Sequence, residues 1–294
     1  MSSWQAPDAS LRYNEICFFT SHNSYAAKKH GYYYAQQHLT IKQQLEAGVR
    51  GLMLDTHRDS VNGEVILCHR SEWVNKLICG GKPHMKVNEA LVTIKEFLNA
   101  HPTEIITIFL ENYIKDKSLV DGSFANAALE SLILAPTDWD PLAQDGWPTI
   151  GWMQQHNKRL IIFNSIEKTK FAYNQWEHVI ENQWGSIYAA QACKERPESR
   201  AYRAHTRYLY AVNYFPRMKI NFGGGYEVIN SLGLDDCLKR AKRGISGGYC
   251  KERLPNFVCL DFVDEGDGLK RVNEINSAAK DTAARAQCFR VIKG

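Results

Sequence analysis

Five short apolar segments of this sequence each end on a residue that can take part in chemistry. The residues at these ends are His22, Asp55, His69, Glu111 and Asp261. Apolar runs of this length are typical of buried strands. When parallel strands alternate with helices, active sites gather at the carboxyl ends of the strands. The pattern therefore predicts that two imidazoles and three carboxylates meet in one cleft, as in a hydrolase or a lyase.

The two histidines, His22 and His69, are suited to the cleavage of a phosphodiester. That reaction needs one group to take a proton from the attacking hydroxyl and another to give a proton to the leaving oxygen. Each such group contributes on the order of 10²–10⁴ in rate. Imidazoles can share these two roles near neutral pH. A purely structural role for a lone histidine is the alternative, and the position at a strand end favours catalysis.

Oxygen ligands for a hard cation follow three of the predicted strands. We expect Asn23, Asp55 and Glu111 to form part of a site for one divalent cation, Ca²⁺ or Mg²⁺, with substrate phosphate and water completing the shell. A salt bridge from Asp55 to Arg50 or Arg58 is the alternative for the aspartate. Glu111 could instead orient a histidine.

Further polar residues lie near the same strand ends. Asp261 could orient His22, because the first and last strands of a closed barrel are neighbours; a helix cap or a barrel salt bridge is the alternative. We expect substrate-binding roles for a wider group of side chains: His57, Arg70, Asn164, Asn213, Tyr214 and Asp261.

Strand-like and helix-like segments alternate along the chain. We expect strands at 16–21, 49–54, 65–68, 104–110, 159–163, 208–212 and 256–262, and helices at 40–47, 88–100, 124–134, 150–155, 227–242 and 269–286. The Asn62-Gly63 pair predicts a hairpin between the Asp55 strand and the His69 strand. Such alternation predicts a parallel sheet covered by helices.

The length of 294 residues suits one large domain. We therefore expect an α/β fold, a distorted TIM (β/α)8-type barrel, as a single domain over residues 1–294. An open doubly wound sheet is less favoured at this length. The first strand is not followed by a GxGxxG motif, which argues against dinucleotide binding.

The composition is that of a globular protein, with 44% hydrophobic and 23% charged residues. A net charge of +4 without a basic run gives no support to nucleic acid as a partner, although it suits an anionic interface or a phosphate-bearing substrate. No apolar run approaches the roughly 18 residues of a transmembrane helix. The N-terminal residues lack signal-peptide features, so we expect a cytoplasmic protein, or a secreted one if a signal peptide was removed.

The eight cysteines form no CxxC pair, which argues against a zinc site. Cys17 and Cys259 lie in apolar segments and are expected to be buried free thiols. Two other pairs could close short loops as disulfides in an oxidising compartment, namely Cys68 with Cys79 and Cys237 with Cys250.

Several segments resemble the X domain of phosphatidylinositol-specific phospholipase C. The most similar are Ser21-His22-Asn23-Ser24-Tyr25, the run 48–55, Leu67-Cys68-His69 and the run 104–111. Further similarity at 145–149, 181–185, 212–216 and 255–262 indicates the branch of PLC-like phosphodiesterases found in plants, fungi and some microbes. The resemblance extends from about residue 14 to about residue 276.

This resemblance implies a distorted TIM barrel that cleaves phosphodiesters, with attack by the inositol 2-hydroxyl and release of diacylglycerol. By position it makes His22 and His69 the catalytic pair and Asn23, Asp55 and Glu111 the metal ligands. Metal-free bacterial relatives carry an arginine at the position of Asp55. Metal-dependent relatives carry a glutamate where this chain has Met53, which weakens the expected cation site. Members of this branch are typically secreted and contain disulfides.

The sequence thus predicts a phospholipase C-type phosphodiesterase that acts on a phospholipid or phosphoinositide headgroup. We expect transient contact with a membrane surface and a monomeric protein. A sphingomyelinase D-like or glycerophosphodiester-type activity on the same barrel is an alternative. A catalytically silent relative that binds a headgroup or a protein is another, and Met53 keeps it open.

Overall fold

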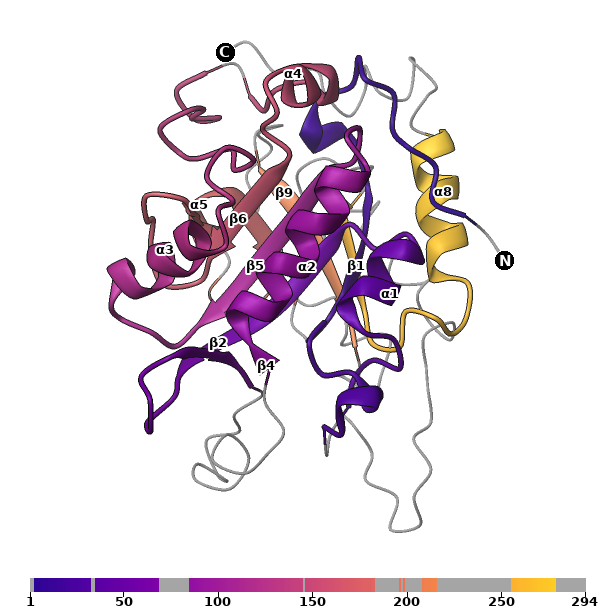
Figure 1. Cartoon of the computed structure of the whole chain (residues 1–294). Coiled ribbons are helices and arrows are strands. Elements are labelled where there is room, and N and C mark those ends of the chain that lie inside the picture. Colours follow the sequence, from indigo (N-terminus) through magenta and orange to yellow (C-terminus); the bar gives the residue numbers. More distant parts are fainter. Residues whose placement is uncertain are drawn as a thin grey trace.

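The computed structural model describes residues 3–32, 35–68, 85–144, 146–182, 196, 198, 208–215 and 255–278. Its centre is a curled sheet with the strand order β7-β6-β5-β2-β1-β10-β9-β8 (Figure 1). The strands of this path are β1 (Phe18–Ser21), β2 (Gly51–Arg58), β5 (Ile106–Asn112), β6 (Leu160–Asn164), β7 (Tyr173–Asn174), β8 (Val179–Glu181), β9 (Leu209–Tyr214) and β10 (Phe257–Leu260).

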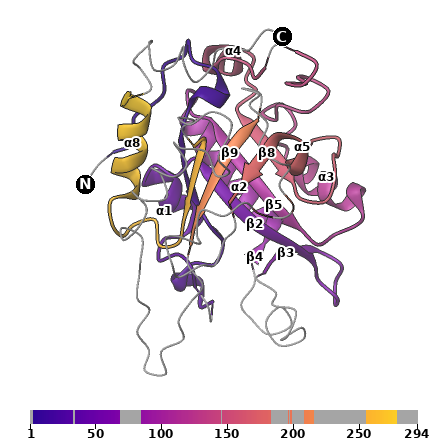
Figure 2. The ribbon, with the colours of Figure 1, turned by 180° about the vertical axis from the view of Figure 1, so that it is seen from behind.

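Every pairing along this path is parallel. The two ends of the path, β7 and β8, are joined in sequence by the four-residue helix α5 (Gln175–His178). Figure 2 shows β8 and β9 on the far side of the curl from the view of Figure 1. The predicted single-domain distorted α/β barrel is confirmed by this parallel, curled sheet.

Helices cover the outside of the sheet and bury one apolar face each. The helices are α1 (Ile41–Glu46), α2 (Val87–Ala100), α3 (Lys117–Asn126), α4 (Ile150–Gln155) and α8 (Gly268–Ala278), with short 3-10 turns η1 (Tyr13–Glu15) and η2 (Lys28–His30). In α2, Ala90, Leu91, Ile94 and Leu98 are buried, at the spacing of one helical face. None of the helices in the described ranges is long and apolar enough to cross a membrane.

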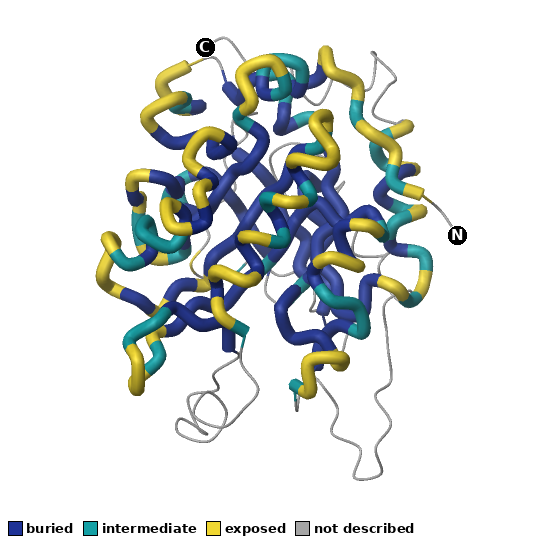
Figure 3. Tube along the Cα trace, in the orientation of Figure 1, coloured by how far each residue is buried: buried dark blue, intermediate teal, exposed yellow. Residues whose placement is uncertain are grey.

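Alternate residues of each strand belong to two different cores. Phe19 of β1 packs in the layer between sheet and helices, whereas Phe18 belongs to the cluster inside the curl. Phe257 of β10 lies at the centre of that inner cluster, with its ring centroid 5.6 Å from that of Phe18 and 4.8 Å from that of Phe109. Figure 3 shows the resulting buried centre. Because side chains alternate along a strand, the residue two positions after an inner aromatic points into the same interior, nearer the carboxyl end.

The hairpin predicted at Asn62-Gly63 is confirmed. Strand β2 continues past Asp55 to Arg58 and pairs antiparallel with β3 (Val65–Leu67), which pairs antiparallel with β4 (Met85–Lys86). Gly63 has a φ of +73°, which favours glycine. Val61 at the tip is 91% exposed.

One predicted helix is wrong in its bounds. We expected 124–134, but α3 spans Lys117–Asn126, because the Asp116 side chain accepts hydrogen bonds from the backbone of Ser118 and Leu119 and so fixes an earlier start. The helix ends before Ala128, whose φ is +52°. The sequence also missed β7, α5 and β8. The helix expected at 227–242, and the part of the last helix beyond residue 278, lie outside the described residues.

Two of the described cysteines are buried free thiols, as the sequence predicts. Cys17 and Cys259 are free and buried, and burial raises the pKa of both thiols above the usual range. Cys68 is disulfide-bonded. Its partner lies outside the described ranges, so the pairing with Cys79, like that of Cys237 with Cys250, stays a prediction.

Candidate active site

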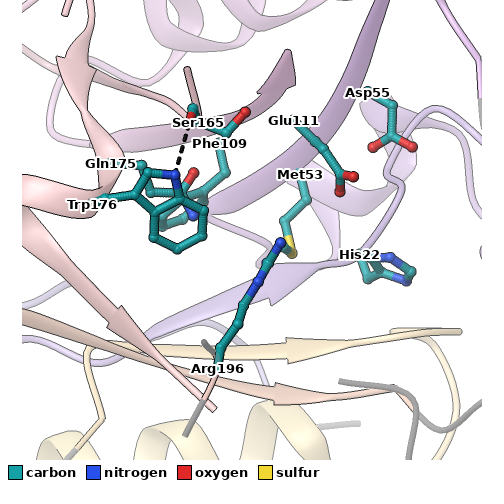
Figure 4. A pocket seen from close by; sticks show the side chains of 9 residues that line it. All are labelled: His22, Met53, Asp55, Phe109, Glu111, Ser165, Gln175, Trp176 and Arg196. Carbon is teal, nitrogen blue, oxygen red and sulfur yellow. Dashed lines mark hydrogen bonds between the residues drawn. The ribbon is translucent and has the colours of Figure 1, made fainter. Parts of the chain in front are cut away.

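A pocket lies where the carboxyl ends of several parallel strands meet (Figure 4). Strand β2 supplies Met53 and Asp55, and strand β5 supplies Phe109 and Glu111. The described residues that line the pocket are His22, Met53, Asp55, Phe109, Glu111, Ser165, Gln175, Trp176 and Arg196. The structure therefore brings His22, Asp55 and Glu111 together, as the strand-end pattern predicts.

His22 is held between a carboxylate and an aromatic ring. Its Nδ1 lies 2.8 Å from Oδ1 of Asp261, which follows β10. The two residues are adjacent because β1 and β10 pair with Ser21 opposite Leu260. The imidazole also stacks on Phe215, with centroids 3.6 Å apart and an interplanar angle of 3°.

The predicted contact between Asp261 and His22 is thus present. Because a carboxylate oxygen can only accept, Nδ1 of His22 carries the proton in this contact. The other nitrogen, Nε2, then has a lone pair with which to accept a proton. Only 14% of the His22 side chain is exposed, so the ring is fixed while its edge meets the pocket.

Asp55 and Glu111 form a pair of carboxylates on neighbouring strands. They are register partners in the parallel pairing of β2 with β5. Asp55 is 4% exposed, whereas Glu111 keeps contact with solvent on its open side. Partial burial of the carboxylate raises the pKa of Glu111 above its usual value, and the negative charge of Asp55 raises it further.

The hydroxyl of Tyr113 opposes this shift. It donates a hydrogen bond of 2.5 Å to Oε1 of Glu111, which favours the ionised carboxylate and lowers the pKa of Glu111. The Tyr113 ring stacks on His57, with centroids 4.3 Å apart. Glu111 is therefore positioned by a side chain that does not itself line the pocket.

Tyr113→Phe removes this hydrogen bond and keeps the ring on His57. Without the donor, the pKa of Glu111 rises further, so a higher pH is needed to ionise it. If catalysis uses ionised Glu111, the acidic limb of the profile of kcat/KM against pH moves to higher pH. Tyr32→Phe, which removes another tyrosine hydroxyl but one bound to the backbone of Leu67 and Met85, should leave the limb in place. An acidic limb at the same pH in Tyr113→Phe and wild type would contradict the assignment.

The residues present fit the predicted divalent cation in part. Asp55 and Glu111 supply two carboxylates to the pocket, and a cation would relieve their mutual repulsion. Asn23 does not line it; its Nδ2 donates to Oε1 of Gln36, 2.8 Å away. Met53 contributes a thioether rather than an oxygen. Within the described ranges no group of three or more histidine, cysteine, aspartate or glutamate side chains is arranged as a metal site.

A second network of polar side chains forms the opposite wall of the pocket. Its centre is Glu181, whose side chain is 1% exposed and whose Oε2 lies 3.0 Å from Nη1 of Arg196. Gln175 Nε2 donates to Oε1 of Glu181 (2.5 Å), and Asn213 Nδ2 donates to Oε2 (2.9 Å). The guanidinium of Arg196 also lies over the ring of Trp176, 4.9 Å from its centroid.

Sequence reasoning missed most of this wall. Arg196 follows no apolar run, and Gln175 and Trp176 belong to a four-residue helix that was not predicted. Glu181 ends the three-residue strand β8, which is too short to show a strand pattern. The signal that could have found it is Glu181 itself, a carboxylate directly after Val179 and Ile180.

Three other predicted site residues, Asn164, Asn213 and Tyr214, do not line the pocket. Asn164 accepts a hydrogen bond from the backbone of Ile166, and Asn213 stands behind the wall on Glu181. Tyr214 is buried. Arg50, which was the alternative salt-bridge partner for Asp55, pairs with Glu104 instead (2.7 Å). His69 and Arg70 lie outside the described residues, so their roles stay predictions.

Proteins of other organisms are similar in sequence to this chain over most of its length. A PI-PLC X domain-containing protein of Arabidopsis thaliana is 30% identical over 96% of this chain and 68% of its own length. A PI-PLC X domain-containing protein 1 of Arthroderma benhamiae is 26% identical over 90% of this chain and 86% of its own length.

Solved structures show the same architecture. The phosphatidylinositol-specific phospholipase C of Listeria monocytogenes superimposes with a TM-score of 0.60 at 14% identity, over 92% of this chain and 96% of that one. A variant of the Staphylococcus aureus enzyme gives 0.59 at 14% identity, over 92% and 95%. The sequence profile of the family PI-PLC X 1 matches residues 9–276. The chain belongs to the PI-PLC X domain family.

Proposed function

We propose that this protein is a phosphodiesterase of the phospholipase C type, acting on a phospholipid headgroup. The observation that carries the proposal is the pair of His22 and Asp261 at one side of a pocket whose other sides hold Asp55, Glu111 and Arg196. A fixed imidazole with a free edge, opposite carboxylates, is the arrangement that acid–base catalysis needs. The phosphatidylinositol-specific phospholipases of like fold support the same chemistry.

In the proposed reaction Nε2 of His22 takes the proton of a headgroup hydroxyl. The hydroxyl oxygen then forms a bond to phosphorus, and the bond from phosphorus to the diacylglycerol oxygen breaks. The leaving oxygen needs a proton, and His69 is the group that the resemblance assigns to supply it. Asp261 holds Nδ1–H of His22 and stabilises the imidazolium that forms. The products are a cyclic phosphate of the headgroup and diacylglycerol.

A divalent cation would be held by Asp55 and Glu111, with oxygens of substrate and water. When bound, such a cation neutralises charge on the phosphate.

Membrane contact is part of the proposal, and Val61 is placed to make it. Val61 is 91% exposed at the tip of the hairpin that extends β2 beyond Asp55. Val61→Glu should lower the affinity for lipid vesicles by roughly tenfold, because insertion of one valine contributes about 1.5 kcal/mol. Turnover of a monomeric short-chain substrate should not change.

Vesicle sedimentation measures this effect. Val92→Glu is the matched control, because Val92 is 37% exposed on α2, outside the sheet. Equal vesicle binding by Val61→Glu and Val92→Glu would show that the hairpin does not touch the membrane.

Product analysis on a lipid panel tests the proposed function. The protein is incubated with vesicles of phosphatidylinositol, phosphatidylcholine or sphingomyelin, with and without Ca²⁺. Diacylglycerol or ceramide with a phosphorylated headgroup supports the phospholipase C type. A free headgroup would favour the sphingomyelinase D-like or glycerophosphodiester-type alternative. Failure to cleave any lipid under either condition would favour a silent relative.

A further inference from the structure

The ring of Phe215 covers one face of His22, the proposed proton acceptor. The two ring centroids lie 3.6 Å apart, and the ring planes differ by 3°. Carbon atoms in contact are about 3.5–4.0 Å apart, so the rings overlap almost completely, with little sideways offset. Phe215 is 6% exposed and belongs to the aromatic cluster inside the curl, but it does not line the pocket. An effect of Phe215 on the chemistry must therefore act through His22.

The register of three neighbouring strands produces this contact. Strand β10 lies between β1 and β9 in the sheet. Ser21 of β1 is opposite Leu260 of β10, which is opposite Tyr214 of β9. One row further, at the carboxyl end, come the residues that follow these three: His22, Asp261 and Phe215. The sheet therefore delivers the imidazole, its carboxylate partner and a phenyl ring to one place.

A fully overlapped stack is not the arrangement that two neutral aromatic rings prefer. Aromatic pairs favour an offset or an edge-to-face geometry, because each ring has a negative face and a positive edge. A positively charged ring, in contrast, is attracted to the negative face of its neighbour. The stack of His22 on Phe215 is therefore more favourable for the imidazolium than for the neutral imidazole.

His22 becomes an imidazolium in the proposed reaction, when Nε2 takes the proton of the attacking hydroxyl. Asp261 contacts the edge of this ring, at Nδ1 (2.8 Å), and Phe215 covers its face. Only 14% of the His22 side chain is exposed, so little water weakens the attraction between the charged ring and the phenyl face. We propose that Phe215 is a positioning residue, which fixes the plane of the His22 imidazole and stabilises its positively charged form. This inference rests on the proposed function and adds a second support for its proton acceptor.

Fluorinated phenylalanines at position 215 separate the charge of the ring face from its shape. Each fluorine withdraws electron density from the ring and weakens its negative face, while the size of the ring changes little. We expect kcat on a short-chain phosphatidylinositol to fall stepwise with one, two and three fluorines. KM should change less, because Phe215 does not line the pocket. The same kcat with all of these rings would overturn the inference and leave the proposed phosphodiesterase activity standing.

Phe215→Leu removes the aromatic face and keeps an apolar side chain. We expect kcat to fall roughly 5- to 30-fold, the contribution of one desolvated cation–π contact. Phe97→Leu is the matched control, because Phe97 on α2 also lies against a histidine ring, that of His101, with centroids 4.4 Å apart. Neither of these two residues lines the pocket. An equal loss of kcat in the two variants would contradict a specific role of Phe215.

NMR relaxation of the ring carbons of His22 tests the inference without turnover. In the wild-type protein the ring should be as rigid as ordered backbone, with an order parameter of about 0.85, and in Phe215→Leu it should be more mobile. If no lipid is cleaved, the proposed function fails, and a His22 ring that loosens in Phe215→Leu still supports the positioning. Equal rigidity of the ring in both proteins would refute it, whether or not lipid is cleaved.

Discussion

His22→Ala is expected to reduce turnover by at least a factor on the order of 10²–10⁴, the contribution of one positioned acid–base group. The imidazole lines the pocket with its Nδ1 bound to Asp261, which leaves Nε2 to accept the proton of a substrate hydroxyl. The substitution also removes the stacking on Phe215 and the contact with Asp261, so some loss in the free energy of unfolding is expected, and the variant must remain folded at the assay temperature. Initial rates with a short-chain phosphatidylinositol and thermal unfolding measure the two quantities.

His38→Ala provides a matched control. His38 also pairs with a carboxylate, with Nδ1 at 3.1 Å from Asp264, and its ring packs on Phe262 with centroids 4.6 Å apart. It does not line the pocket. If His38→Ala and His22→Ala lose the same activity, the loss comes from damage to the structure and the catalytic assignment is wrong.

Asp261→Asn is expected to lower kcat on the order of 10²-fold with a smaller effect on KM. The substitution keeps the shape of the side chain but removes the negative charge 2.8 Å from Nδ1 of His22. It therefore weakens stabilisation of the imidazolium and permits the wrong tautomer of the ring. Asp261 acts through His22, so it is a positioning residue.

A double-mutant cycle distinguishes this role from a purely structural one. Asp261→Asn should cost nothing further in the His22→Ala background, because residues that act as a unit have non-additive effects. Asp264→Asn, beside His38, should leave turnover unchanged. Losses of Asp261→Asn and His22→Ala that multiply in the double variant would contradict the dyad.

The fold could be predicted from the sequence wherever a strand or helix has a local signature. The capping box of Thr40 and Gln43 begins α1, and the apolar face of Ala90, Leu91 and Ile94 gives α2 its period. Strands that are buried on both faces appear as apolar runs, as in β5 and β6. Elements of two to four residues, such as β7, α5 and β8, have no such signature, because tertiary pairing alone defines them.

The residues of the candidate site also differ in whether a local sequence pattern could predict them. His22, Asp55, Glu111 and Asp261 could be found because each directly follows or ends an apolar strand, and parallel pairing brings these ends together. Arg196 and Trp176 could not, because their place in the pocket depends on an ion pair and a ring contact between separate segments. Phe215, which stacks on His22, was likewise not singled out by its position after β9.

The two walls of the pocket differ in their charges. On one side, Asp55 raises the pKa of Glu111, so this wall favours a cation or a proton. On the other, the Glu181 carboxylate compensates the positive charge of Arg196.

The most direct test of phospholipase C-type cleavage in this pocket is phosphorus NMR of the products formed from phosphatidylinositol. The proposed mechanism predicts that wild-type protein produces a cyclic phosphodiester of the headgroup together with diacylglycerol, and that His22→Ala produces neither at a measurable rate. Phosphatidic acid with free inositol, or the same products at the same rate from His22→Ala, would contradict it.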